Sequence, residues 1–203
     1  MSLDQRLVLV RHGRTAWNAE GRFQGQADPS LDTIGWEQAR RTAAAVAELR
    51  PAAIVSSDLR RAHQTAVMLG AACGLIPSTD RNLRELALGA WEGLGRDEAA
   101  DRFPAEYAAW AAGVDVRRGG GETQAEAGAR VAAALIRFLW RARSGSTVVA
   151  VSHGLALQGA MGVLVAGGLV RLDEAAPPHL ANGEWIVLPV GRGARRHGEG
   201  YAA

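Results

Sequence analysis

Short apolar runs alternate along this chain with longer stretches in which apolar residues recur every three or four positions. An apolar run of four to eight residues is typical of a buried β-strand, and the longer period is typical of an amphipathic helix. Strands and helices that alternate in this way are typical of βαβ units, whose strands form a parallel sheet. The expected strands are Arg6–Val10, Ala52–Ser56, Thr147–Ser152 and Glu184–Val190, and the expected helices are Thr33–Leu49, Leu59–Cys73, Thr123–Arg143 and Leu155–Ala166.

The stretch from Leu83 to Gly121 breaks this alternation. Its large aromatic residues lie among Glu, Asp and Arg, and it ends in three consecutive glycines. We interpret it as short helices that form a lid over the carboxyl ends of the strands. The pattern as a whole therefore predicts an α/β fold: a three-layer α/β/α sandwich with a mostly parallel central sheet and a small helical lid.

The length of 203 residues suits one domain. We expect this domain to span residues 1–191, with the lid inserted at about residues 83–121. Residues 192–203 are rich in Gly and Arg, and we expect them to form a flexible C-terminal tail.

Composition and charge exclude several classes of protein. With 48% hydrophobic and 22% charged residues, the chain has the composition of an ordinary globular protein. The net charge is +2, and the basic residues are dispersed among acids, so we expect no nucleic-acid partner. The most apolar late segment contains Gln158 and Arg171, which favours a core helix over a membrane span. We find no secretion signal, and the lone Cys73 suits a reducing compartment, so we expect a cytoplasmic protein.

Arg11 and His12 follow directly on the first apolar run, where a buried strand would end in a loop. Open α/β sheets bind their ligands at the carboxyl ends of their strands. A histidine there can attack phosphorus, and an arginine can donate two hydrogen bonds to phosphate oxygens. By itself such a pair is more often solvated than catalytic, so the argument depends on the other motifs of the chain.

Three further motifs place charged or polar residues at the ends of predicted elements. Residues 56–66 join the second strand to its helix and contain Arg60 and Arg61; residues 83–86 contain Glu85; and residues 151–154 place His153 directly after a strand. Hydrolysis of a phosphomonoester needs a neutral nucleophile, donors that balance the phosphoryl charge, and an acid that protonates the leaving alkoxide. These residue types can supply all three.

Together the motifs resemble those of the histidine phosphatase superfamily, in the branch that contains cofactor-dependent phosphoglycerate mutases and related bacterial phosphatases. The resemblance extends from about residue 7 to residue 154, with the motifs in the family's order. It implies that His12 becomes phosphorylated, with its ring oriented by a backbone carbonyl. It also implies that Arg11, Arg61 and His153 form the phosphate pocket, and that Glu85 is the proton donor and later the base for water.

The resemblance also suggests residues that bind substrate. Asn18 matches a polar donor at the edge of the pocket, and Thr15 and Gln24 either line the pocket or satisfy backbone groups of the loop. We include Gly25 and Gly154 among the substrate-binding residues.

Three residue types near the motifs have competing interpretations. Arg60 competes with Arg61 for the pocket, but Arg61 holds the family's position and we expect Arg60 to be solvated. Glu92 is close enough to Glu85 in sequence to be confused with it. The tryptophans are expected to pack mostly in the core or the lid, with substrate contact as the alternative for Trp91 and Trp110.

We expect no metal ion and no cofactor. No spacing of Cys and His suits zinc, and the acids near the motifs are not clustered as a magnesium site needs. The glycine run 119–121 lacks the Lys and Ser/Thr of a P-loop.

The predicted function is hydrolysis of a small phosphorylated metabolite, without metal, through a phosphohistidine intermediate. The patterns at residues 24–26 and 118–122 look like those of bacterial phosphatases, including enzymes that act on glycosylated phosphoglycerates, so a phosphoglycerate or a glycosylated phosphoglycerate is the suggested substrate. Family members are often homodimers, which leaves a homodimer as an expectation here.

Two alternative functions are weighed against hydrolysis. A phosphoglycerate mutase of this family carries Tyr and Lys after the acid, where this chain has Leu88 and Arg96, and has a longer lid. Both differences favour a hydrolase. A non-catalytic module that binds a phosphorylated ligand should have lost the nucleophile or the acid, whereas both are present.

Overall fold

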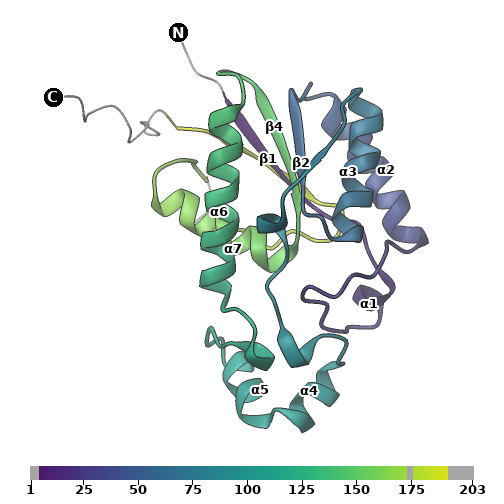
Figure 1. Cartoon of the computed structure of the whole chain (residues 1–203), viewed down its shortest axis with the longest axis vertical. Coiled ribbons are helices and arrows are strands. Elements are labelled where there is room, and N and C mark those ends of the chain that lie inside the picture. Colours follow the sequence, from purple (N-terminus) through teal and green to yellow (C-terminus); the bar gives the residue numbers. More distant parts are fainter. Residues whose placement is uncertain (1–4, 173–175, 192–203) are drawn as a thin grey trace, which may run out of the picture.

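The computed structural model describes residues 5–172 and 176–191, which form a five-stranded sheet with helices on both faces (Figure 1). Neighbouring strands are parallel, except that β5 is antiparallel to β1. The predicted α/β fold with a mostly parallel central sheet is therefore confirmed. In spatial order the strands are β3 (Ser78–Thr79), β2 (Ala53–Ser56), β4 (Thr147–Ser152), β1 (Arg6–Arg11) and β5 (Trp185–Pro189).

Two helices cover each face of the sheet. On one face lie α2 (Thr33–Ala47) and α3 (Arg60–Cys73), and on the other lie α6 (Gln124–Arg141) and α7 (Gly154–Ala166). The ends of these helices differ from the predicted ends by at most two residues. The strand β3 was not predicted, because an element of two residues has no detectable period.

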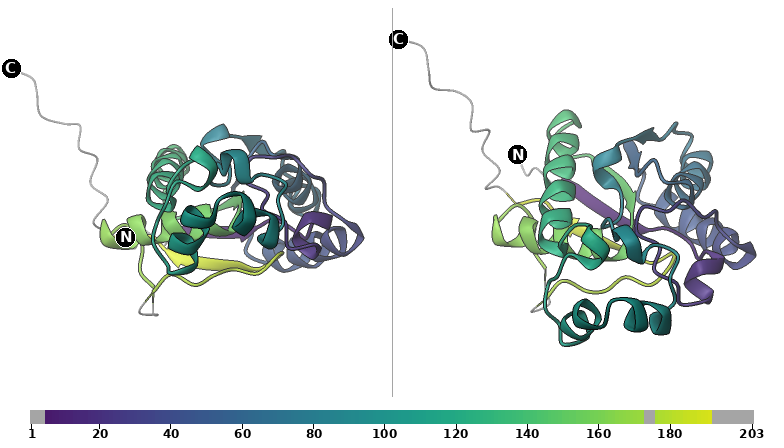
Figure 2. Two further views of the ribbon diagram at one scale, coloured as in Figure 1. Left: turned by 90° about the horizontal axis from the view of Figure 1, so that it is seen from below. Right: turned by 60° about the horizontal axis from the view of Figure 1, so that its bottom comes forward.

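The stretch that breaks the alternation forms short helices, as the sequence predicts. Its α-helices are α4 (Arg96–Arg102) and α5 (Pro104–Ala111), and its 3-10 turns are Gly89–Trp91 and Arg118–Gly120. Another 3-10 turn, Arg81–Leu83, ends where this stretch begins. Both α-helices lie beyond the end of the sheet toward which β1, β2 and β4 point, and Figure 2 shows them in front of that end when the molecule is viewed from below. A further short helix, α1 (Ala16–Ala19), follows β1.

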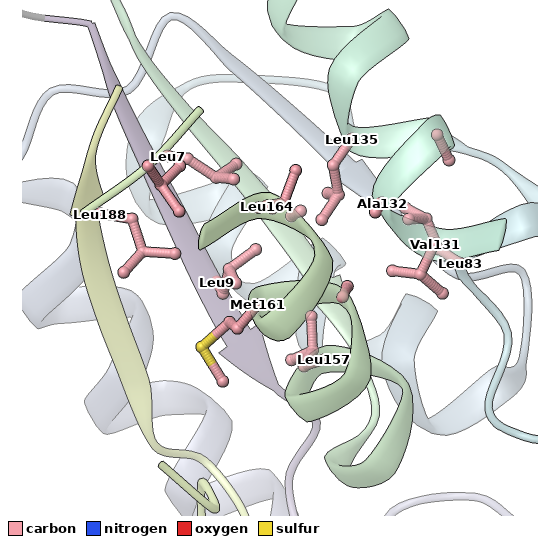
Figure 3. Close-up of a cluster of buried hydrophobic side chains, with 14 of the residues drawn as sticks. Leu7, Leu9, Leu83, Val131, Ala132, Leu135, Leu157, Met161, Leu164 and Leu188 are labelled. Carbon is pink, nitrogen blue, oxygen red and sulfur yellow. The ribbon is translucent and has the colours of Figure 1, made fainter. Parts of the chain in front are cut away.

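Alternation of side chains along β1 explains the two cores. Leu7 and Leu9 pack with α6 and α7, whereas Val8 and Val10 pack with α2 and α3. Figure 3 shows the first of these cores, in which the side chains of α7 lie against β1 and β5. A strand that is buried on both faces needs a continuous apolar run. Arg11 ends this run, so the chain leaves the core at the edge that carries the lid.

The predicted C-terminal tail and the question of a membrane span are considered next. The flexible tail expected at residues 192–203 lies outside the described residues. Within residues 5–172 and 176–191, no helix has the length and apolar character needed to cross a membrane.

Candidate active site

His12 follows the last residue of β1 and is buried, with 3% of its surface exposed. Its Nδ1 lies 2.7 Å from the carbonyl oxygen of Gly13. Because a carbonyl only accepts, Nδ1 carries the proton, and Nε2 keeps its lone pair. The backbone thus fixes the tautomer that a nucleophilic histidine needs.

The environment of His12 keeps its ring neutral. Burial is the main cause, and the nearby Arg61 guanidinium adds to it, so that the pKa of His12 lies well below its ordinary value of 6.5. Arg61 Nε donates to His12 Nε2 at 3.2 Å, which agrees with an unprotonated Nε2. At neutral pH the pocket therefore holds an uncharged imidazole beside a guanidinium.

Arg61 belongs to the first turn of α3 and is almost completely buried. Its terminal nitrogens donate to the carbonyl oxygens of Ala27 and Gly25 at 2.7 and 2.8 Å. These acceptors hold the guanidinium without neutralising it. Burial lowers the pKa of Arg61 to about 10, so it stays charged at neutral pH.

Arg11 ends β1 and contacts the segment that precedes β5. Its Nη1 donates to the carbonyl oxygen of Leu180 at 2.7 Å and lies 3.1 Å from His179 Nε2. Its buried Nε has no hydrogen-bond partner among the described residues. Burial lowers the pKa of Arg11, and Glu85 and Glu184 raise it.

His153 follows β4 and is completely buried. Its ring centroid lies 5.0 Å from that of His12. Burial and the charge of Arg61 keep the pKa of His153 well below 6.5, so its ring is neutral and carries one N–H. Neither ring nitrogen has a hydrogen-bond partner in the described part of the chain. A buried N–H without a partner is destabilising, so the ring is suited to donate to an oxygen of a bound anion.

Glu85 follows the 3-10 turn Arg81–Leu83, and its carboxylate lies at the start of α7. It accepts hydrogen bonds from the backbone nitrogens of Leu86, Leu155 and Ala156 at 3.0, 3.4 and 2.9 Å. The free N–H groups at a helix start are favourable partners for a carboxylate. The fold thus fixes an acidic group at the border of the pocket.

Four of these groups, Arg11, His12, Arg61 and Glu85, line a cavity of about 340 Å³ beneath the lid. They are four of the five residues predicted to be catalytic. The fifth, His153, does not line the cavity, but its ring lies edge-on against that of His12. The lining consists of Arg11, His12, Asn18, Arg22, Phe23, Gln24, Gly25, Arg61, Glu85, Leu86, Leu88, Arg96, Trp110, Arg118, Gly154, Leu155 and His179.

Four of the five residues predicted to bind substrate also line the cavity: Asn18, Gln24, Gly25 and Gly154. Thr15 does not. Its hydroxyl lies 3.0 and 3.1 Å from the amide oxygens of Gln24 and Asn18, so it contacts lining residues from behind. Of the two interpretations given for Thr15, the structure favours the one in which it organises the loop.

Gly25 and Gly154 each lie close to a charged side chain. Gly25 has φ +52°, and an added Cβ would lie 2.3 Å from Glu92 Oε1. At Gly154 an added Cβ would lie 3.2 Å from Arg11 Cζ. Without a Cβ, Gly25 lets the Glu92 side chain approach the loop, and Gly154 lets the Arg11 side chain approach the start of α7.

The structure separates the competing residues. Arg60 is exposed and pairs with Asp28 at the surface, whereas Arg61 lines the cavity. Glu92 accepts from the backbone nitrogens of Gln26 and Leu88 and is not part of the lining. Trp91 is completely buried inside the lid, whereas Trp110 lines the cavity.

Several lining residues were not predicted, and Arg118 is the most informative of them. It is 4% exposed, and its guanidinium has no hydrogen bond or ion pair with the described residues. Its Cζ lies 5.7 Å from the centroid of the Trp110 ring, and Arg96 lies over the same ring at 5.4 Å. The pattern at residues 118–122 was noted in the sequence, but nothing there indicated that the arginine would be buried.

His179 is a second lining residue that the sequence analysis did not single out. The chain between α7 and β5 brings it to the cavity and to Arg11. In the described part of the chain, no group of three or more His, Cys, Asp or Glu side chains is arranged to hold a metal ion.

The lining combines several guanidinium groups with one carboxylate, that of Glu85. Such a cavity attracts a group with two negative charges, and it places a neutral imidazole and an acid beside that group. This is the arrangement that phosphoryl transfer requires.

Comparison with known proteins agrees with this geometry. The model of the histidine phosphatase superfamily (branch 1) matches residues 7–197. This match covers most of the chain, which therefore belongs to the histidine phosphatase superfamily.

Individual relatives carry two kinds of name. A glucosyl-3-phosphoglycerate phosphatase from Mycobacterium tuberculosis is 41% identical over 126 residues, 62% of this chain and 56% of that protein, so the chain spans little more than half of that relative. Another from Mycolicibacterium vanbaalenii is 37% identical over 91% of this chain and 79% of that protein. A probable phosphoglycerate mutase GpmB from Yersinia pestis is 36% identical over 91% of this chain and 92% of that protein.

A solved structure shows the same fold. The mycobacterial glucosyl-3-phosphoglycerate phosphatase Rv2419c in complex with VO3 superimposes with a TM-score of 0.77, at 32% identity, over 90% of each chain.

We predict that the two neutral histidines make stability depend on pH. In the unfolded chain both take up protons below about pH 6.5, whereas in the folded chain they do not, so the free energy of unfolding falls as pH falls below this value. The loss should reach up to about 1.4 kcal/mol per pH unit for each histidine. Urea unfolding at pH values between 6.5 and 5 measures it.

His12→Asn and His153→Asn should each reduce this slope, and His63→Asn, which replaces a half-exposed histidine of α3, is the matched control. Equal slopes in the wild type and in both buried-site variants would contradict the neutral state assigned to these rings.

Proposed function

We propose that this protein hydrolyses a small phosphomonoester, without a metal ion, through a phosphohistidine formed at His12. The observation that carries the proposal is the state of His12, a buried neutral imidazole whose Nδ1 proton is held by Gly13 and whose Nε2 lies beside Arg61. Membership of the histidine phosphatase superfamily supports it.

In the first step His12 Nε2 attacks the phosphorus atom as the bond between phosphorus and the ester oxygen breaks. Arg11, Arg61 and the N–H of His153 donate to the phosphoryl oxygens, and Arg61 exchanges its hydrogen bond to His12 for one to the substrate. Glu85, in its protonated form, gives its proton to the leaving alkoxide, which departs as an alcohol.

In the second step the Glu85 carboxylate takes a proton from water, and the water oxygen attacks the phosphorus atom of phosphohistidine. The bond between nitrogen and phosphorus breaks, inorganic phosphate leaves, and His12 and protonated Glu85 are restored. The two steps therefore use one residue as acid and then as base, with no net proton gain by the enzyme.

The proposed substrate is a phosphorylated carboxylic acid, a phosphoglycerate or a glycosylated phosphoglycerate. Arg118 supports this choice, since its guanidinium lines the cavity without an acceptor among the described residues and is suited to bind a carboxylate. A second cavity of about 140 Å³ adjoins the first, with Trp110, Arg118 and Leu155 common to both linings, and it offers space for a further group on the acid. The phosphatases among the relatives, named for glucosyl-3-phosphoglycerate, support the same class.

A phosphoglycerate mutase is the second candidate, because of the relative named GpmB. Leu88 and Arg96, which differ from the Tyr and Lys of the family's mutases, both line the cavity and support hydrolysis instead. An assay of phosphoglycerate isomerisation beside phosphate release distinguishes the two activities: net phosphate release without isomerisation is expected.

The proposal includes a cytoplasmic location and a small phosphorylated metabolite as partner. A homodimer remains a prediction from the family resemblance, which light scattering of the purified protein would check.

We predict that Glu85→Gln impairs alkyl phosphates more than aryl phosphates. An alkoxide is a poor leaving group and needs the proton, whereas an acidic phenol leaves without it. Turnover of an alkyl ester should fall by about 10²–10⁴-fold, and phosphorylation of the enzyme by an aryl ester should fall much less. With the base for water also lost, phosphoenzyme should accumulate from the aryl ester after a burst.

Rapid-quench measurement of the burst and of steady-state turnover tests this role. Equal losses for both esters without accumulation would show that another group is the acid.

We predict that Arg118→Met raises KM for phosphorylated acids by about tenfold or more, because a charge-assisted hydrogen bond to a carboxylate contributes about 1.5–3 kcal/mol. The KM for a phosphomonoester of similar size without a carboxylate should change little. Arg117→Met is the matched control, since Arg117 is exposed and pairs with Glu126.

Steady-state kinetics with the two substrates measure this difference. Equal changes in KM for both substrates, or equal changes in the Arg117 and Arg118 variants, would exclude a carboxylate subsite at Arg118.

A further inference from the structure

Arg130, in α6, uses every N–H group of its guanidinium, three on the segment that carries Glu85 and two on Glu122. Two of these groups donate to Glu122, from Nε at 2.9 Å and from Nη2 at 2.7 Å. The other three donate to backbone carbonyl oxygens, of Asn82 at 3.0 Å, Arg84 at 3.1 Å and Glu85 at 3.3 Å. All five donors of the side chain therefore bind either Glu122 or the short segment 82–85.

Glu122 connects to the same loop from the other direction. Its Oε2 accepts from the backbone nitrogen of Ala87 at 3.0 Å, and its own backbone nitrogen donates to the Ala87 carbonyl at 2.9 Å. Glu122 directly follows the three consecutive glycines at residues 119–121. The pair of Glu122 and Arg130 thus holds backbone groups on both sides of Glu85.

The carboxylate at the other end of Glu85 accepts from the backbone nitrogens at the start of α7. Its backbone carbonyl accepts from Arg130 and also from Gln26 Nε2 at 3.2 Å. Two helices, α6 and α7, therefore hold the two ends of one acidic residue. Neither Arg130 nor Glu122 lines the cavity.

We propose that Arg130, oriented by Glu122, is a positioning residue that sets where the Glu85 carboxyl group stands relative to the leaving oxygen. The inference rests on the role proposed above for Glu85. A proton is transferred efficiently only when donor and acceptor atoms lie within hydrogen-bond reach in the reacting complex. A displacement of about 1 Å can cost about 10²-fold in rate.

A purely stabilising role does not account for this arrangement as well. The side chains of Arg130 and Glu122 are 21% and 25% exposed, and ion pairs that are only partly buried contribute little to stability. A pair that served stability alone would not need three carbonyl acceptors in the four-residue stretch that ends at the acid.

Arg130→Met and Glu122→Gln test the proposal through the leaving group. Both variants should lose about 10- to 100-fold in turnover of an alkyl phosphate and much less in the phosphorylation step with an aryl phosphate. Arg130→Lys restores a charge but cannot reach all five acceptors, so it should lie between the wild type and Arg130→Met. The dependence of the rate on the pKa of the leaving alcohol is the quantity to compare.

Arg137→Met is the matched control, because Arg137 lies in the same helix and its guanidinium is 3.5 Å from Asp80 at the surface. It should leave the ratio of alkyl to aryl rates unchanged. Circular dichroism and urea unfolding of each variant identify any that fails to fold, and Arg130→Lys then carries the test.

Two results would overturn the proposal. One is a loss in folded variants that is equal for alkyl and aryl esters, and the other is no loss with either ester. If Glu85→Gln shows the leaving-group effect while the Arg130 and Glu122 variants do not, only the positioning role fails. If Glu85→Gln itself shows no such effect, the proposed role of Glu85 fails first.

Discussion

Positive charge that is buried without equal negative charge is the constraint on which this site depends. Arg61 and Arg118 are almost fully buried, Arg11 lies beside them, and Glu85 supplies the one carboxylate of the cavity lining. Backbone carbonyls hold Arg11 and Arg61 but do not neutralise them. Burying a charge without a counter-charge is expensive, so the cavity favours an anion with more than one charge. Burial, helped by the charges of Arg61 and Arg11, keeps the pKa values of His12 and His153 well below 6.5, so both rings are neutral.

The fold provides this concentration of charge without weakening its core. Between their first and last residues β1 and β4 are apolar and buried on both faces, and at their carboxyl ends Arg11 pairs with Ser152, which His153 follows directly. The start of α7 follows directly and supplies N–H groups to Glu85. The groups proposed to be catalytic therefore occupy the ends of rigid elements, and the lid contributes further residues to the lining of the cavity.

The residues that belong to strong local patterns could be predicted from the sequence. The apolar runs before Arg11 and His153 predicted the two strand ends. The motifs that contain Arg61 and Glu85 predicted two further residues of the same cavity. Arg118 could not be predicted, because its burial results from packing against Trp110 in a lid without periodic pattern. His179 could not be predicted either, since a long-range approach to Arg11 leaves no local signal. Thr15 was placed in the right loop, but its hydroxyl points to Gln24 rather than into the cavity.

The central claim is that His12 carries the phosphoryl group during turnover. Incubation of the protein with an isotopically labelled phosphomonoester in the presence of a chelator, followed by rapid quenching in base, tests it directly. The account predicts a single phosphoryl group, stable in base and labile in acid, that mass spectrometry locates on His12 and that His12→Ala does not form. Phosphorylation at the wild-type level in His12→Ala, or a dependence on added metal, would contradict it.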